Sequence, residues 1–319
     1  MAPVLVCPDA FKGTWRAAQV AGAIGRGLER GGLEPPDLCP VADGGEGTME
    51  VLLTALGGET AGATVSDPLG RPVAAGYALI EGGGTAIVEV AQASGLALGD
   101  GRAEEASTRG TGELIAHAID AGAQVVLIAA GGSATTDGGA GAIAAIDEAG
   151  GLRGAALVVL CDVRTPFEQA AATFAPQKGA DPAAVERLAQ RLDDHARRLP
   201  RDPRGVPMTG AAGGLSGGLW AAYGAHLEPG AAFVLEAIGF DERLRHARAI
   251  VTGEGRLDAT SLDGKAAGEV AGRAHDAGVP AHAIVGVDAL HAHEHLQTIR
   301  EASSLEEITA AAETLAAEL

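Results

Sequence analysis

The stretch Val125–Gly141, VVLIAAGGSATTDGGAG, passes from an apolar run into a loop that is nearly bare of side chains. The apolar run is typical of a buried strand, and the loop holds five glycines and a single carboxylate, that of Asp137. A strand that leaves through such a loop toward a helix predicts a parallel α/β sheet with a ligand site beyond the strand end.

The same pattern occurs twice near the N-terminus. Val4–Cys7 predicts a strand that leaves into PDAFKG, and the helix after it carries apolar residues four positions apart. Leu38–Val41 predicts a second strand that leaves into ADGGEGT, and Thr48 can cap the helix that follows. These two units predict the first part of the parallel sheet.

The pattern returns near the C-terminus. A helix expected across Phe233–His246 leads to a strand at Ala249–Thr252 and the loop GEGRLD. A helix at Lys265–Ala277 then leads to a strand at Ala281–Val285, and a last strand is expected near Leu305–Ile308. Together these segments predict the rest of the sheet that begins at the N-terminus.

Between these two parts the sequence no longer shows the alternation of strand, glycine-rich loop and helix. From Thr64, Pro-Leu-Gly and Gly-Gly-Gly turns separate extended runs, a pattern that indicates antiparallel hairpins. We therefore predict two α/β domains, one with a parallel sheet from residues 1–62 plus 228–319, and an inserted mixed-sheet domain from residues 63–227.

Composition excludes several classes of protein. The net charge of −19 argues against nucleic acid or an anionic membrane as partner. No apolar stretch reaches the roughly 20 residues that span a bilayer, and the N-terminus has no basic leader. The cysteines at 7, 39 and 161 form no CxxC pair, which favours a cytoplasmic location and argues against a zinc cluster.

The basic residues show a strong bias toward arginine. Of 23 basic residues only three are lysine, Lys12, Lys178 and Lys265, and each of them neighbours a glycine. A compact ammonium among glycines suits a phosphate oxygen better than a bulky guanidinium does. The alternative is chance placement among 48 glycines.

Four loops that follow predicted strands carry carboxylates: PDAFKG, VADGGEGT, GGSATTDGGAG and TGEGRLD. Their glycines let backbone N–H groups approach an anion, and each following helix presents its positive N-terminus. Carboxylates beside a phosphate site indicate Mg²⁺, and the combination predicts phosphoryl transfer from a nucleotide. The sequence has no Walker motif and no dinucleotide-binding fingerprint.

These loops together resemble the bacterial type I glycerate kinases. The motifs occur along the chain in the order PDAFKG, VADGGEGT, SDPLGRPV, VEVAQASGL, GTGELI, GGSATTDGGAG, FAPQKGA, GAAGGL and TGEGRLD. The resemblance implies an ATP- and Mg²⁺-dependent kinase that converts D-glycerate to 2-phosphoglycerate. It also implies that the discontinuous domain is flavodoxin-like.

The resemblance and the chemistry of the side chains give each candidate residue an expected role. The expected catalytic residues are Lys12, Asp137, Lys178 and Asp258, with Asp137 as the first choice for the base. The expected metal ligands are Asp43 and Glu46. The expected nucleotide-binding residues are Gly44, Gly45, Gly47, Gly131, Gly132, Ser133, Gly213 and Gly214. The expected substrate-binding residues are Asp9, Arg71, Arg109, Asp162 and Glu254.

Two other functions stay open on the sequence alone. The first is a kinase of the same design that acts on another small hydroxy acid. The second is a non-catalytic regulator that binds phosphorylated metabolites through the same loops.

Overall fold

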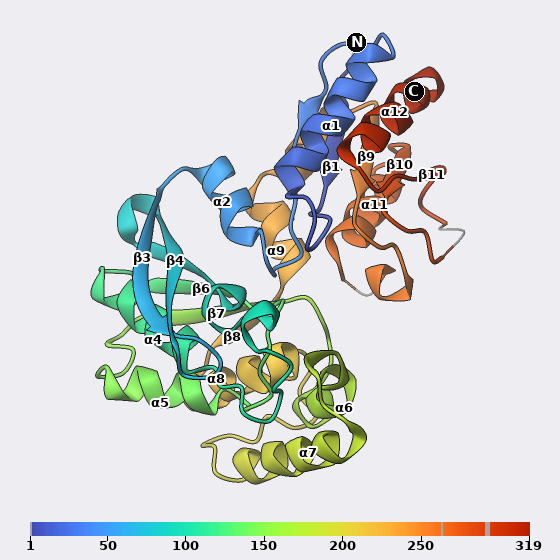
Figure 1. Ribbon diagram of the computed structural model, residues 1–319. Coiled ribbons are helices and arrows are strands. Elements are labelled where there is room, and N and C mark those ends of the chain that lie inside the picture. The colour runs from blue at the N-terminus through green and yellow to red at the C-terminus, as the bar shows by residue number, and fades with distance from the viewer. Residues whose placement is uncertain (1, 263, 291–293) are drawn as a thin grey trace. The chain divides into compact units, whose positions relative to one another are not determined.

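The computed structural model describes residues 2–262, 264–290 and 294–319. The chain divides into two compact units (Figure 1). Unit 1 comprises Met1–Asp43 and Ala231–Leu319, and unit 2 comprises Gly44–Gly230. Among the described helices, none has the length and apolar character needed to cross a membrane.

Unit 1 contains a five-stranded sheet in which neighbouring strands run parallel. Its strands, in spatial order, are β2 (Asp37–Leu38), β1 (Val4–Pro8), β9 (Ala249–Gly253), β10 (Ala281–Val285) and β11 (Thr298–Glu301). Numbered within this unit, the order is 2-1-3-4-5, which is that of flavodoxin-like folds. The flavodoxin-like parallel sheet is confirmed.

Five helices accompany this sheet: α1 (Ala17–Arg30), α9 (Gly230–Ala237), α10 (Phe240–His246), α11 (Ala266–Asp276) and α12 (Leu305–Leu315). Apolar residues of α1 and α12 share one buried cluster with Val4 and Val6 of β1. The two helices lie so close together that a Cβ added to Gly27 of α1 would come within 2.2 Å of the carbonyl oxygen of Thr309 in α12. Glycine at this position therefore permits the close packing.

Unit 2 contains a six-stranded mixed sheet, as predicted. In spatial order its strands are β3 (Glu59–Ser66), β4 (Pro72–Ile80), β5 (Thr85–Glu89), β6 (Val125–Ala129), β7 (Ala156–Cys161) and β8 (His226–Pro229). The pairs β3–β4 and β4–β5 are antiparallel, which confirms the expected hairpins. From β5 to β8 the strands run parallel.

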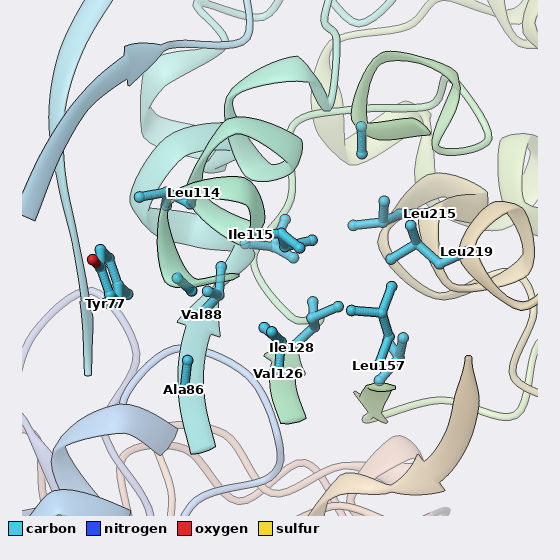
Figure 2. Close-up of a cluster of buried hydrophobic side chains, with 14 of the residues drawn as sticks. Tyr77, Ala86, Val88, Leu114, Ile115, Val126, Ile128, Leu157, Leu215 and Leu219 are labelled. Carbon is cyan, nitrogen blue, oxygen red and sulfur yellow. The ribbon is translucent and has the colours of Figure 1, made fainter. Parts of the chain in front are cut away.

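The helices of unit 2 are α2 (Thr48–Leu56), α3 (Val90–Ser94), α4 (Arg109–Asp120), α5 (Ala140–Glu148), α6 (Ala170–Phe174), α7 (Pro182–Ala196) and α8 (Leu215–Tyr223). Figure 2 shows the core, where Leu114 and Ile115 of α4 and Leu215 of α8 pack over the strands. The strand side chains beneath them include Val88 and Ile128, both fully buried.

Two predicted elements differ in the structure. The helix expected across Phe233–His246 is broken into α9 and α10 at Gly239, which has a φ of +69°. The strand expected near Leu305–Ile308 is wrong, because these residues begin α12. Ser304 accepts a hydrogen bond from the backbone of Glu307, and the Glu307 side chain bonds back to Ser304, so a capping box starts the helix there.

The boundary between the units falls after Asp43, whereas the first domain predicted from the sequence extends to residue 62. Local contacts explain this difference. The backbone N–H groups of Gly47 and Met49, at the start of α2, both donate to Glu89 at the end of β5. The strand β3 pairs with β4 over its whole length. Residues 44–62 therefore belong to unit 2.

Candidate active site

A pocket of about 380 Å³ lies in unit 1 at the carboxyl ends of the parallel strands. Every strand of the sheet contributes to it through residues that follow the strand: residues 9–12 and 14, Asp43, residues 254–256, residues 286–287 and Ser303. The order of the strands reverses between β1 and β9, and ligands of open α/β sheets bind at such a switch point. The pocket therefore occupies the position that the fold favours for a ligand.

The pocket brings together charged side chains of both signs. Its acids are Asp9, Asp43 and Glu254, and its cations are Lys12, Arg256 and Lys265. Nζ of Lys12 lies 2.5 Å from Oδ2 of Asp43. The Lys12 side chain is 47% exposed, whereas that of Asp43 is 1% exposed. Lys12 thus compensates a buried carboxylate while it stays accessible from solvent.

Asp9 is a buried acid at the end of β1. Its Oδ1 accepts a hydrogen bond of 2.6 Å from the backbone N–H of Ala10. Burial and the neighbouring charge of Asp43 hold the pKa of Asp9 well above its usual value, although the charge of Lys12 opposes them. Burial and the charge of Asp43 thus oppose the ionisation of Asp9.

Glu254 follows β9 and is only 7% exposed. Its Oε1 is buried without a hydrogen-bond partner among the described residues. Burial raises the pKa of Glu254 to about 7, against a hydrogen bond from Ser261 and the charge of Lys265. An unpartnered buried carboxylate oxygen in a pocket is costly unless a ligand completes its hydrogen bonding.

Glycines hold the loop of Glu254 tightly against its neighbours. A Cβ at Gly253 would lie 2.2 Å from the carbonyl oxygen of Ile284, and a Cβ at Gly286 would lie 2.4 Å from that of Gly255. The backbone N–H of Gly286 donates to the carbonyl of Glu254. The close approach of backbone segments thus explains these glycines and holds the backbone around Glu254 in place.

Asp258, an expected catalytic residue, lies farther along the same loop and is not among the residues that line the pocket. Its Oδ2 is 3.3 Å from Nε of Arg256, and its backbone N–H donates to Oγ of Ser261. These contacts connect Asp258 to Arg256, which itself lines the pocket.

In unit 2, Asp137 is surrounded by hydrogen-bond donors. Its Oδ2 accepts from the backbone and hydroxyl of Thr108, both at 2.9 Å, and from the backbone of Gly141 at 3.2 Å. Its Oδ1 accepts from the backbone of Gly139 at 3.1 Å. The carboxylate therefore joins the start of α4 to the start of α5, and its expected role as the base stays a prediction.

Lys178 is also buried in unit 2 and holds the same loop. Its Nζ donates to Oγ of Ser133 at 3.1 Å and to the carbonyl of Thr135 at 2.6 Å. Burial lowers the pKa of Lys178 to about 8, although the charges of Asp137 and Asp162 raise it. Lys178 and Asp137 thus stabilise the GGSATTDGGAG loop from within.

Glu89 is a buried acid that the sequence analysis did not single out. Its Oε1 accepts 2.9 Å hydrogen bonds from the backbone of Gly47 and of Met49, so the N-terminus of α2 already has an anionic partner. Burial raises the pKa of this carboxyl. The sequence pattern that could have identified Glu89 is a carboxylate directly after the buried run Thr85–Val88.

Most of the expected nucleotide-binding glycines pack closely against other backbone in unit 2. A Cβ added to Gly44 would lie 2.6 Å from Cα of Gly230, and one added to Gly131 would lie 2.8 Å from Cα of Gly45. A Cβ added to Gly213 would lie 1.9 Å from the carbonyl oxygen of Thr135. A Cβ at Gly214 would meet Phe167 at 2.8 Å. Close packing thus accounts for these positions, whereas Gly47 and Gly132 adopt positive φ without such crowding.

The two arginines expected to bind the substrate carboxylate are engaged by acids of unit 2. Arg71 donates to Asp67 at 2.5 Å and to Asp100 at 2.7 Å. Arg109 pairs with Glu113 at 3.0 Å and also with Glu148. Their guanidinium groups therefore have local structural partners.

Asp162 and Glu46 complete the expected residues. A Cβ at Gly131 would lie 3.5 Å from Oδ2 of Asp162, which places Asp162 beside the GGSATTDGGAG loop. Glu46 is exposed in the loop before α2. Within residues 2–262, 264–290 and 294–319, no three His, Cys, Asp or Glu side chains form a group that could hold a metal ion.

Lys265 is a pocket residue for which the sequence indicated a phosphate contact but no catalytic or substrate-binding role. It is the N-cap residue of α11 and lines the pocket beside Glu254. The scarcity of lysine in the chain was the signal that pointed to it.

Comparisons with known proteins agree on one family. A sequence model of the glycerate kinase family matches residues 4–150 and 146–319. A glycerate kinase of Bacillus subtilis is 38% identical, with 89% of this chain and 84% of that protein covered. A glycerate 2-kinase of Escherichia coli is 35% identical, with 82% of this chain and 79% of that protein covered.

A solved structure is also similar. The crystal structure of a protein described as glycerate kinase 2 from Salmonella typhimurium LT2 matches with a TM-score of 0.80 and 32% identity. The match covers 99% of this chain and 97% of that chain. With its buried acids and lysines at the switch point of a flavodoxin-like sheet, the chain belongs to the glycerate kinase family.

Proposed function

We propose that this protein transfers the γ-phosphoryl group of ATP to D-glycerate and forms 2-phosphoglycerate and ADP. Membership of the glycerate kinase family and the names of the relatives support this reaction. The observation that carries it in this chain is the pocket of unit 1, where accessible cations stand beside buried acids. Phosphoryl transfer needs both, because charge must be neutralised while a hydroxyl is oriented.

The pocket suits a small hydroxy acid. A volume of about 380 Å³ holds a molecule of glycerate size together with a phosphoryl group. Arg256 and Lys265 line it and supply positive charge for the substrate carboxylate. These residues replace Arg71 and Arg109 in that role, because the latter two pair with acids of unit 2.

Lys12 supports the transfer step. Its ammonium group lines the pocket and is half-exposed, so it can contact a phosphoryl oxygen without being moved out of a buried site. An ammonium ion at this position stabilises the negative charge on the oxygens of the transferring group. Asp43 keeps Lys12 in the pocket through their ion pair.

Mg²⁺ is a further part of the proposal. The described residues contain no ready-made group of three metal ligands, and Asp43 is engaged by the Lys12 ammonium. These observations fit an ion that arrives with the nucleotide, because Mg²⁺ is commonly held by one or two carboxylates plus substrate phosphates. Glu46, which is exposed, is then the proposed protein ligand. When bound, the ion would neutralise charge on the phosphates.

The nucleotide-binding role of Gly47, Gly132 and Ser133 remains a proposal, as does a cytoplasmic location. The positive φ values of Gly47 and Gly132 support backbone exposure at those two positions. The location is supported by three cysteines that are all free and buried.

The test is incubation of the purified protein with D-glycerate and Mg²⁺·ATP. We expect ADP release that depends on D-glycerate, and a product that enolase alone converts, which identifies 2-phosphoglycerate. A product that needs phosphoglycerate mutase before enolase acts would contradict the 2-position. If tartronate or another hydroxy acid gave ADP release and D-glycerate gave none, the proposed substrate would be wrong.

A further inference from the structure

We propose that Glu254 is the general base of the reaction and accepts the proton of the C2 hydroxyl of D-glycerate. This inference rests on the proposed function and assigns its proton-transfer step to one residue. It takes this role away from Asp137 and makes the pocket of unit 1 the site of the acceptor.

The unpartnered oxygen of Glu254 is the first argument. Oε1 is buried, its residue is only 7% exposed, and no described group donates a hydrogen bond to it. The residue lines a pocket that is large enough for the acceptor. A hydroxyl donor in the pocket would complete the hydrogen bonding of Oε1, which is the geometry a general base requires.

The other acids of the pocket have partners that reduce their availability. Oδ2 of Asp43 lies 2.5 Å from the ammonium group of Lys12. Oδ1 of Asp9 accepts a short hydrogen bond from the backbone of Ala10. A base that must first give up an ion pair or a backbone donor is a poorer proton acceptor than one with an open lone pair.

Asp137 is excluded as the base for the same reason. Its two oxygens accept four hydrogen bonds from Thr108, Gly139 and Gly141. A proton on this carboxylate would break contacts that join two helix starts. Glu254, whose Oε1 accepts no hydrogen bond from the described residues, is therefore the better candidate for the base.

The surroundings of Glu254 support proton transfer near neutral pH. Burial raises its pKa to about 7, so its carboxylate is a stronger base than an exposed glutamate and is still substantially ionised. The charged residues that share the pocket with it are Asp9, Lys12, Asp43, Arg256 and Lys265. The cations among them favour the ionised form that the reaction needs.

The C2 oxygen of glycerate forms a bond to the γ-phosphorus of ATP, and the bond between that phosphorus and the β–γ bridging oxygen breaks. The electrons of the broken bond leave with ADP. The hydroxyl proton passes to Oε1 of Glu254 and is then released to solvent.

The experiment compares Glu254→Gln with wild type and with Glu254→Asp. Glutamine preserves the size of the side chain but removes the base, so we expect kcat to fall by about 10²- to 10⁴-fold. The dissociation constant for D-glycerate, measured by calorimetry, should change by less than about threefold, since binding by Lys265 and Arg256 is retained. Aspartate should recover part of the lost kcat.

The control is Glu313→Gln, which makes the same charge change at an exposed position of α12 in the same unit. Wild-type activity with D-glycerate is measured first, so its absence would refute the proposed function rather than this inference. If wild type is active and Glu254→Gln keeps kcat within about fivefold of it, the base is elsewhere.

A loss of folding in Glu254→Gln is recognised by circular dichroism. In that case the pH dependence of wild-type kcat decides. An acidic limb with an apparent pKa near 7 supports Glu254, and a kcat that is constant from pH 5.5 to 8 overturns the proposal.

Discussion

Asp137 in unit 2 and Glu254 in unit 1 are both acids of glycine-rich loops that follow a parallel strand. Asp137 accepts four hydrogen bonds from its own unit, whereas Oε1 of Glu254 accepts none from the described residues. The first carboxylate is satisfied before any ligand arrives, and the second is not. An acid in a glycine-rich loop therefore stabilises the loop in unit 2, at Asp137, and leaves an oxygen lone pair for a ligand in unit 1, at Glu254.

Two lysines show the same contrast. Lys178 is buried and donates to a hydroxyl and a carbonyl of the GGSATTDGGAG loop. Lys12 is half-exposed, pairs with Asp43 and lines the pocket. Of these two ammonium groups, only that of Lys12 lines the pocket, so Lys12 is the one for which we propose a phosphate contact.

Apart from the loss of the proposed base, the largest expected effect is that of Lys12→Ala on activity. Loss of the ammonium group should lower kcat by about 10²- to 10³-fold, because the charge that develops on the phosphoryl oxygens loses a stabilising partner. Steady-state ADP release with D-glycerate measures it. Arg26→Ala, at an exposed position of α1, is the control and should leave kcat unchanged. Turnover close to that of wild type in Lys12→Ala would remove Lys12 from the chemistry.

Asp137→Ala should act mainly on stability. Four donors lose their acceptor at once, so we expect the free energy of unfolding to fall by about 2–4 kcal/mol. Urea unfolding followed by circular dichroism measures it, with Glu186→Ala on the exposed face of α7 as the control. A change below about 0.5 kcal/mol would contradict the positioning role of this carboxylate.

Glu254→Gln should have a smaller and pH-dependent effect on stability. The pKa of Glu254 is raised in the folded state, so folding favours its protonated form. Ionised Glu254 therefore destabilises the wild type above pH 7, and this penalty disappears as the pH falls below 4.5, the ordinary pKa of a glutamate.

The variant should accordingly be more stable than wild type by about 1–3 kcal/mol at pH 8, with the difference shrinking toward pH 4. Urea unfolding at the two pH values measures both differences. A variant less stable than wild type at pH 8 would show that the buried carboxylate has partners in the folded protein that compensate its charge.

The smallest expected effect is that of Arg109→Ala. Its guanidinium group is exposed and pairs with Glu113 and Glu148, so we expect a stability change below about 1 kcal/mol. The KM for D-glycerate should stay within about twofold of the wild-type value, because no substrate contact is lost. A KM raised tenfold or more would return Arg109 to the substrate site.

The sequence predicted the parallel strands well where they are buried runs, as at Val4–Pro8 and Ala281–Val285. It missed Thr298–Glu301, because this edge strand is only partly buried and carries two charged residues. It also missed the capping box that makes Leu305 the first residue of a helix rather than part of a strand.

The motifs predicted several residues of the pocket, but not their hydrogen-bond partners. The motifs selected Asp9, Lys12, Asp43 and Glu254, and the structure places these four in one pocket. The role of Asp137 depends on Thr108, which lies 29 residues earlier in the chain. No local sequence pattern indicates that a donor so distant along the chain bonds to the carboxylate of Asp137. In the sequence, Asp137, whose oxygens accept hydrogen bonds, therefore cannot be distinguished from Glu254, whose Oε1 accepts none from the described residues.

The most direct test is a side-by-side measurement of kcat for Glu254→Gln and Asp137→Asn with D-glycerate and Mg²⁺·ATP, below the melting temperature of both variants. We predict that Glu254→Gln retains less than about 1% of wild-type turnover and that Asp137→Asn retains more than about 10%. The reverse order, with Asp137→Asn inactive and Glu254→Gln near wild type, would contradict the assignment of proton transfer to unit 1.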